Sequence, residues 1–233
     1  MSIEVFPVVH VSNQEQALEQ SNIAFDSGAD GVYLIDHTSR APEHLLSAFN
    51  RVASEHPDEF VGLNFLGLGS GLAVYRFLQQ ANNAGALEKL PSGIWVDDAI
   101  SGREELCALR AQDESLQTVR YLGGTAFKYT RTYTPNPEDA ALQAVEMAPF
   151  VDVVTTSGAG TGKSPSPEKI AAMKRAIGEQ QLAVASGIDV ANIAEYAGSL
   201  DQVLVASSVE TIPYSGIFDQ DKFSEFIAAA HQL

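Results

Sequence analysis

The chain has 233 residues, 45% of them hydrophobic, which is enough for one barrel-sized domain with a large core. Its formal net charge of −16 disfavours binding to nucleic acid or to an anionic membrane, since both require clustered cations. A single cysteine, Cys107, excludes an internal disulfide, and no apolar run reaches membrane-spanning length. Because no charged and then apolar leader precedes Val5, we expect a cytoplasmic protein.

Strand-like and helix-like segments alternate along the whole chain, which predicts a parallel sheet with crossover helices. The strand-like runs are residues 5–11, 31–36, 60–65, 93–97, 118–129, 151–155, 182–185 and 203–206. Helical patterns follow at residues 14–27, 42–55, 71–84, 103–113 and 137–147, then from Pro167, after Asp189 and at 220–230. Eight units of roughly 20 to 32 residues predict a single-domain (β/α)8 TIM barrel over residues 1–233. A doubly wound open sheet is the alternative, and the even spacing favours closure.

Gly123 and Gly124 interrupt the fifth strand-like run. A glycine pair inside a strand indicates a bulge or a close approach of another backbone. The sequence leaves open which half of residues 118–129 is the barrel strand.

Residues 157–164, Ser-Gly-Ala-Gly-Thr-Gly-Lys-Ser, superficially resemble a phosphate-binding P-loop. The P-loop pattern requires glycine where Ser157 stands and a helix that begins at the Lys-Ser pair. Pro165 and Pro167 delay the helix instead, so we reject a nucleotide-hydrolysing P-loop. The segment from Ser157 and Gly158 to Lys163 is interpreted as a lid, as a phosphate contact or as a mobile surface loop.

Two turns of small residues follow the seventh and eighth strands. Ser186 and Gly187 follow the first of them, and Ala206, Ser207 and Ser208 follow the second. Small side chains leave main-chain N–H groups uncovered, and TIM barrels commonly bind phosphate after these two strands. The turns therefore predict a phosphate site, whereas each turn taken alone is also explained by ordinary turn and cap requirements.

Polar side chains recur near the carboxyl ends of the other strands, where TIM barrels place their active sites. The candidates for acid–base chemistry are His10, Asp36, Asn64, Asp97 and Lys128. A protonated Lys128 would serve as an anchor or electrophile, and a desolvated one would form a Schiff base with a carbonyl substrate. Each residue alone also has a structural explanation, such as a core histidine or a helix cap. The spacing of these residues does not indicate a metal site, and no cofactor is required.

The last three strands and their loops carry a resemblance that extends over most of the chain. VDVVTTSGAGTG, VASGIDVANIAEY and VLVASSVE resemble the BtpA family of barrels related to the phosphate-binding superfamily. Weaker similarity surrounds His10, Asn64 and Lys128, where that family has similar residues, and the closing IPYSGIFDQDKFSEFI also resembles it. The chain departs from the family after His10, where Ser12-Asn13-Gln14 replaces a proline-rich turn. The resemblance implies a barrel with a phosphate site and relatives in photosystem I biogenesis and in sugar and nucleoside metabolism.

Two functions follow as hypotheses. The first is an enzyme for a small phosphorylated metabolite, a sugar phosphate or a nucleotide, that catalyses isomerisation, lyase chemistry or N-glycosidic cleavage. The second is a non-catalytic factor of the BtpA type that uses the barrel to bind or stabilise a partner. We expect a phosphorylated ligand and neither nucleic acid nor membrane as partner, and the sequence leaves a homo-oligomer open.

Overall fold

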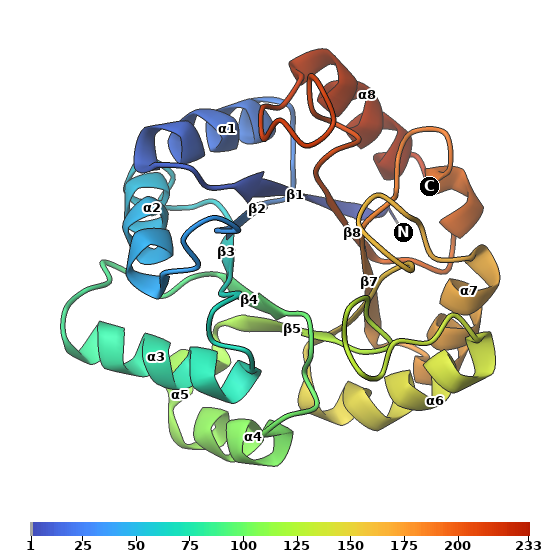
Figure 1. Ribbon diagram of the computed structural model, residues 1–233, viewed down its shortest axis with the longest axis horizontal. Coiled ribbons are helices and arrows are strands. Elements are labelled where there is room, and N and C mark those ends of the chain that lie inside the picture. Colours follow the sequence, from blue (N-terminus) through green and yellow to red (C-terminus); the bar gives the residue numbers. More distant parts are fainter. Residues whose placement is uncertain (1) are drawn as a thin grey trace.

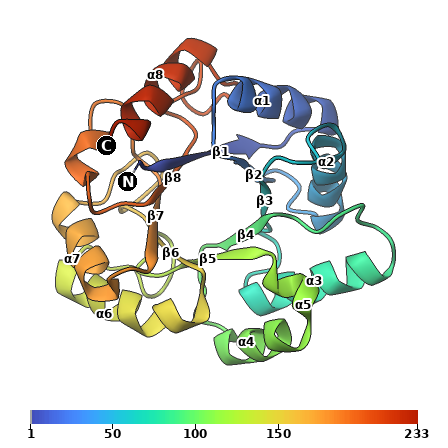
Figure 2. The same cartoon turned by 180° about the vertical axis from the view of Figure 1, so that it is seen from behind.

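The computed structural model describes residues 2–233, which form one closed barrel of eight parallel strands in chain order. Figures 1 and 2 show the ring of strands from opposite sides, with the helices arranged outside it. Because β1 also pairs with β8, the predicted single-domain TIM barrel is confirmed and the open sheet is excluded. Met1, the first residue of the predicted domain, lies outside the described residues.

The eight strands are short and agree closely with the predicted runs, with one exception. They are β1 Glu4–His10, β2 Val32–Ile35, β3 Val61–Asn64, β4 Gly93–Val96, β5 Arg120–Gly124, β6 Val153–Thr156, β7 Gln181–Ala185 and β8 Gln202–Val205. The exception is β5, which ends at Gly124, so that Lys128 lies in the following loop. A Cβ atom on Gly124 would lie 2.0 Å from the Asp97 carbonyl oxygen, so the glycine pair marks a close backbone approach.

Helices connect most of the strands. They are α1 Gln14–Asp26, α2 Pro42–Glu55, α3 Gly71–Asn83, α4 Arg103–Gln112, α5 Glu114–Gln117, α6 Pro137–Met147, α7 Pro167–Ile177 and α8 Gln220–His231, with 3-10 turns η1 Ala148–Phe150 and η2 Ile193–Tyr196. Side chains cap several of them, as Ser166 does where its Oγ accepts the Lys169 N–H of α7. Within residues 2–233, no helix is long and apolar enough to cross a membrane.

The regular helix predicted after Asp189 is wrong. The Asp189 carboxylate accepts the N–H groups of Ala191 and Asn192, as a helix cap would, but only the short turn η2 follows. The Asn192 side chain donates back to the Gly187 carbonyl oxygen at 2.9 Å, and Gly198 then turns the chain with a φ of 71°. Since α4 and α5 both lie between β4 and β5, the one-helix-per-strand pattern is broken at two places.

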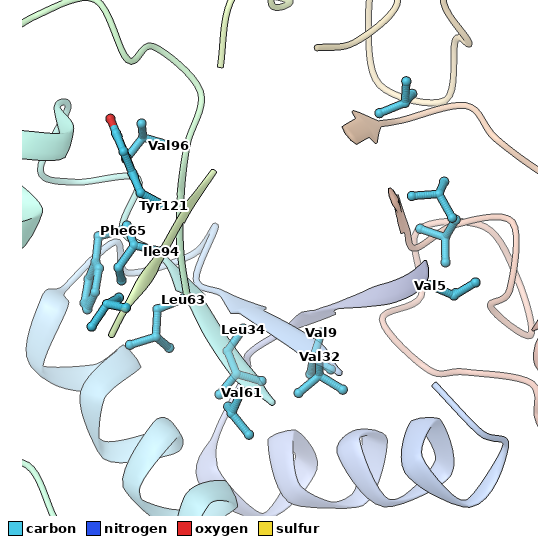
Figure 3. Close-up of a cluster of buried hydrophobic side chains, with 14 of the residues drawn as sticks. Val5, Val9, Val32, Leu34, Val61, Leu63, Phe65, Ile94, Val96 and Tyr121 are labelled. Carbon is cyan, nitrogen blue, oxygen red and sulfur yellow. The ribbon is translucent and has the colours of Figure 1, made fainter. Parts of the chain in front are cut away.

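Two layers of apolar side chains make the core, one on each face of the strands. The outer core lies between strands and helices; Figure 3 shows part of it, with Val9, Leu34 and Leu63 on the successive strands β1, β2 and β3. The inner core fills the barrel with Phe6, Val8, Tyr33, Ile35, Trp95, Leu122, Phe127, Val153, Ala183, Ala185 and Leu204. Alternate residues of a strand face opposite sides, so both faces of these strands are apolar. The barrel interior is therefore a packed core and not a channel.

Candidate active site

A cavity of about 800 Å3 opens at the carboxyl ends of the strands. This volume lies in the usual range for small-molecule sites. All eight strands or their following loops contribute, among them Val8, His10, Ile35, His37, Arg40, Leu66, Trp95, Asp97, Lys128, Tyr129, Thr161, Gly162, Ser186, Gly187, Ser207, Ser208 and Tyr214. Side chains of the inner core form its apolar floor, and the polar groups stand above that floor.

Two histidines lie together on one wall of the cavity. His10 is two residues beyond Val8 and His37 two residues beyond Ile35, so both continue the inward-facing rows. Their ring centroids are 5.0 Å apart in an edge-to-face arrangement. Burial, together with the charges of His37 and Lys128, lowers the pKa of His10 to about 4. The ring of His10 is therefore neutral near pH 7 and able to accept a proton.

Asp97 and Lys128 supply the acid and amine groups of the cavity. Asp97 follows β4 and accepts a hydrogen bond of 3.3 Å from Nδ2 of Asn64, which is itself 2% exposed and does not line the cavity. Burial raises the pKa of Asp97, although the hydrogen bond from Asn64 and the charge of Lys128 both act to lower it. Burial also lowers the pKa of Lys128, although the charge of Asp97 acts to raise it. Both shifts favour the neutral forms, and perturbed pKa values caused by burial and by a charged partner in a cleft are typical of functional sites.

The loop that carries Lys128 is held by Ser157 and by Lys169, a residue that the sequence analysis missed. The main-chain N–H of Lys128 donates to the Ser157 Oγ at 2.8 Å. The buried ammonium group of Lys169, on α7, donates to the carbonyl oxygens of Ser157 and Ala126, both at 2.9 Å. Burial lowers the pKa of Lys169 to about 8. Lys169 therefore ties the loops after β5 and β6 together beneath Lys128.

The turns after β7 and β8 form the opposite wall. Among residues 2–233, the N–H groups of Gly187, Ile188, Ser207 and Ser208 donate no hydrogen bond. Free N–H groups of this kind bind anions without a side-chain cation. The carboxylate of Asp189 also lines the cavity, where it is engaged by the N–H groups of its own turn.

Ser186 and Gly187 hold the neighbouring loop as well as lining the cavity. The Ser186 Oγ accepts the Gly162 N–H and donates to the Gly160 carbonyl oxygen, each at 3.0 Å. Gly187 has a φ of 76°, and a Cβ atom there would lie 2.1 Å from the Ser164 nitrogen. Only glycine allows this approach, so the turn after β7 fixes residues 158–164 against the mouth.

No protein-family model matches this chain, and its sequence matches no curated protein. Solved structures, in contrast, show its fold. The chain is similar to phosphoribosyl anthranilate isomerase from Thermus thermophilus, with 17% identity and a TM-score of 0.63 over 97% of this chain and 98% of that one. It is similar to a phosphoribosyl anthranilate isomerase in complex with reduced 1-(o-carboxyphenylamino)-1-deoxyribulose 5-phosphate, with 17% identity and a TM-score of 0.65 over 99% and 100% of the two chains.

A third similar structure is (S)-3-O-geranylgeranylglyceryl phosphate synthase from Thermoplasma acidophilum with its substrate sn-glycerol-1-phosphate. Here the identity is 12% and the TM-score 0.63, over 100% of this chain and 94% of the other. The last two structures hold phosphorylated compounds, which is a property of those proteins. At such identities the likeness to all three establishes the barrel fold of this chain.

Besides Asn64, three predicted site residues do not line the cavity. Ser157 is fully buried and its Oγ donates to the Gly158 carbonyl oxygen. A Cβ atom on Gly158 would lie 2.1 Å from the Lys163 carbonyl oxygen, so both residues pack the base of the loop. Asp36 accepts hydrogen bonds from Ser39 and from Nδ1 of His44, the latter at 2.8 Å. Burial opposes its ionisation, but these hydrogen bonds hold its pKa well below the usual range.

Strained backbone is concentrated around the mouth. Every non-glycine residue with positive φ among residues 2–233 lies in a loop that follows a strand: Arg40, Ala126, Tyr129, Ser186 and Tyr214. All but Ala126 line the cavity. Such conformations cost free energy and cluster at functional sites. Within the same residues, no group of three or more His, Cys, Asp or Glu side chains is placed to hold a metal ion.

Proposed function

We propose that this chain is an enzyme that acts on a small phosphorylated metabolite, a sugar phosphate or a nucleotide, by acid–base chemistry in the mouth cavity. The observation that carries the proposal is the composition of its two walls. His10, Asp97 and Lys128 lie in the same cavity as the free N–H groups after β7 and β8. One wall would bind the phosphate while the other moves protons.

Phosphate binding is assigned to the N–H groups of Gly187, Ile188, Ser207 and Ser208. Their hydrogen bonds would neutralise phosphate oxygens as they do at other main-chain nests. Ser186 and Ala206 line the same wall. Ser157 and Gly158, which the sequence also predicted as phosphate ligands, would contribute indirectly by shaping the loop above.

Proton transfer is assigned to His10, Asp97 and Lys128. A neutral His10 accepts a proton from the bound substrate, and Asp97 or Lys128 returns one to the developing product. Asn64 orients Asp97, and Asp36 holds the loop that carries His37. Isomerisation, aldol-type cleavage and N-glycosidic cleavage each require such a transfer.

Schiff-base formation is the alternative role for Lys128. A neutral amine would attack a carbonyl carbon, and the imine would form with loss of one water. Treating the protein with borohydride and a phosphorylated keto sugar, followed by peptide mass spectrometry, separates the two mechanisms. A stable adduct on Lys128 supports the Schiff base, and its absence supports proton transfer.

A thermal-shift titration against inorganic phosphate, sugar phosphates and mononucleotides tests the proposal. A ligand at a hundredfold excess over its Kd adds about 2.7 kcal/mol, which raises the Tm by about 5 to 10 °C in a chain of this size. We expect Ser208→Asp to abolish the shift by placing a carboxylate in the nest, and Ser208→Ala to retain it. Trp95, the single tryptophan, lies in the cavity floor, so its fluorescence should change on the same titration.

The absence of any shift or fluorescence change would overturn the phosphate proposal. It would favour the rival function, a BtpA-like factor that binds a partner without catalysis. The exposed side chains of Ile212 and Ile217, on the loop after β8, would then offer an apolar contact surface beside the mouth.

A further inference from the structure

Two tyrosine side chains stand at the rim of the cavity with most of their surface in water. Tyr129, in the loop after β5, is 77% exposed, and Tyr214, in the loop after β8, is 64% exposed. Both line the cavity. Large aromatic side chains exposed at a cavity mouth are typical of contact sites for a ligand or a partner.

Both tyrosines are held in a backbone conformation that favours glycine. Tyr129 has a φ of 64° and Tyr214 a φ of 70°. A residue with a bulky side chain rarely adopts the left-handed region, because its Cβ atom crowds the backbone. Two such residues on separate loops of one cavity indicate that their positions serve the site.

The hydroxyl groups of both tyrosines meet the same short segment of the loop after β6. The Tyr129 hydroxyl accepts the Thr161 N–H at 3.1 Å. The Tyr214 hydroxyl lies so close to Gly162 that a Cβ atom there would be 2.6 Å away. The Tyr129 hydroxyl is thus hydrogen-bonded to Thr161 and the Tyr214 hydroxyl lies beside Gly162, while both residues border the cavity.

The floor beneath the rings suits a ligand with an apolar part. Trp95, Ile35 and Leu204 form an apolar base that a phosphate group cannot use. The cavity, at about 800 Å3, also exceeds the space that a bare phosphate requires. A phosphorylated ligand that fills this cavity would therefore have a second portion besides its phosphate.

We propose that Tyr129 and Tyr214 form an aromatic clamp that recognises a planar ring of the ligand. This inference rests on the proposed phosphate site and deepens it: the substrate class is a phosphorylated compound with a planar ring, such as a mononucleotide, and not a simple sugar phosphate. Tyrosine rings stack on planar groups with little loss of conformational freedom, since the side chain has two rotatable bonds.

Calorimetric titration with three related compounds tests the clamp. Adenosine 5′-monophosphate and ribose 5-phosphate differ by the base, whereas adenosine lacks only the phosphate. We expect the nucleotide to bind at least about tenfold more tightly than ribose 5-phosphate, the range measured for stacking of one base. Tyr129→Leu and Tyr214→Leu should each weaken nucleotide binding about tenfold and leave ribose 5-phosphate unaffected.

Matched controls separate stacking from general damage to the rim. Ile212→Ala alters an exposed apolar side chain on the same loop as Tyr214 that does not line the cavity, and it should leave binding unchanged. Uridine 5′-monophosphate and phenyl phosphate extend the panel to smaller rings. The Tm of each ligand-free variant should lie close to that of the wild type, because both tyrosines are exposed and Tyr129→Leu removes only one exposed hydrogen bond, from the Thr161 N–H.

The outcomes distinguish the clamp from the phosphate site. Equal affinity for ribose 5-phosphate and all ring compounds overturns the clamp and leaves phosphate binding in place. If adenosine binds in a tyrosine-dependent manner and adenosine 5′-monophosphate binds no more tightly than adenosine, the clamp is supported and the phosphate site is overturned. If no compound of the panel binds, both are overturned.

Discussion

The ammonium group of Lys169 lies 2.9 Å from the carbonyl oxygen of Ala126, whose own backbone has a φ of 47°. Ala126 and Lys169 are both buried, and Ser157 offers a second carbonyl oxygen to the same ammonium group. One buried cation thus holds two loops of the mouth through main-chain atoms. The geometry of Lys128 depends on both loops.

We predict that Lys169→Met lowers the free energy of unfolding by about 1 to 3 kcal/mol, because two buried carbonyl groups lose their donor. Urea denaturation measures the change. Lys222→Met is the matched control, since Lys222 also donates to two carbonyl oxygens but is exposed. A loss equally small in both variants would contradict a structural role for Lys169.

Ser186→Ala should loosen the loop after β6 without unfolding the barrel. The substitution removes the hydrogen bonds of Ser186 with Gly160 and Gly162 but keeps the backbone conformation at φ 112°. Hydrogen exchange at the Gly162 amide should become faster, while the amides of β7 stay protected. Unchanged exchange at Gly162 would show that other contacts hold the loop.

His10 should make stability depend on pH between about pH 4 and 6.5. The folded protein keeps the buried ring neutral down to about pH 4, whereas the unfolded chain binds a proton near pH 6.5. Between these two pH values the unfolded state binds more protons than the folded state. The contribution of His10 to the free energy of unfolding is therefore complete above pH 6.5 and is lost as the pH falls toward 4. Allowing for the part of the ring that water reaches, we expect a loss of about 2 kcal/mol.

Unfolding free energies of the wild type and of His10→Gln at pH 7 and pH 4.5 measure that contribution. The variant should lose less stability on acidification. His37→Gln removes a ring whose pKa is also lowered by burial and whose charge contributes to the shift at His10, so it should reduce the wild-type slope by less than His10→Gln does. Identical slopes for wild type and His10→Gln would show that His10 does not titrate in this way.

Asp97→Asn should make Lys128 more reactive toward amine reagents at neutral pH. The carboxylate of Asp97 favours the ammonium form of Lys128, so its removal lowers the pKa of Lys128 further. Labelling with acetic anhydride, quantified by peptide mass spectrometry, measures the change, with the exposed Lys163 as internal reference. The variant should keep or gain stability because a desolvated carboxylate is removed, and any turnover should fall about 100-fold or more.

The alternation of the strands explains which site residues the sequence located and which it did not. Ile35 faces the barrel interior, so His37 reaches the cavity and Asp36 points away from it. Both faces of a buried parallel strand are apolar, so the apolar run before Asp36 does not show which side of the sheet Asp36 faces. For that reason the sequence analysis placed Asp36 in the site. His10 and Asp97 each stand two residues beyond an inward-facing side chain, Val8 and Trp95, and both line the cavity as the sequence analysis expected.

The position of Lys169 in the sequence could have predicted that its side chain is held by hydrogen-bond acceptors. Lys169 lies in the first turn of α7, where the positive end of the helix dipole disfavours a cation. A lysine at such a place indicates a compensating set of acceptors. The left-handed residues Tyr129 and Tyr214 left no such signal, because their conformation depends on contacts between loops that are distant in the chain.

The distribution of charge governs how quickly an anionic compound reaches the mouth. Arg40 and Lys128 line the cavity, whereas the chain as a whole carries a charge of −16. We therefore expect the net charge to repel a phosphorylated molecule at long range, and the cations and free N–H groups of the mouth to act only at short range, beside the acids Asp97 and Asp189. Salt screens the repulsion over a Debye length of about 10 Å at 0.1 M, so added salt should accelerate association until it also weakens the contacts at the mouth.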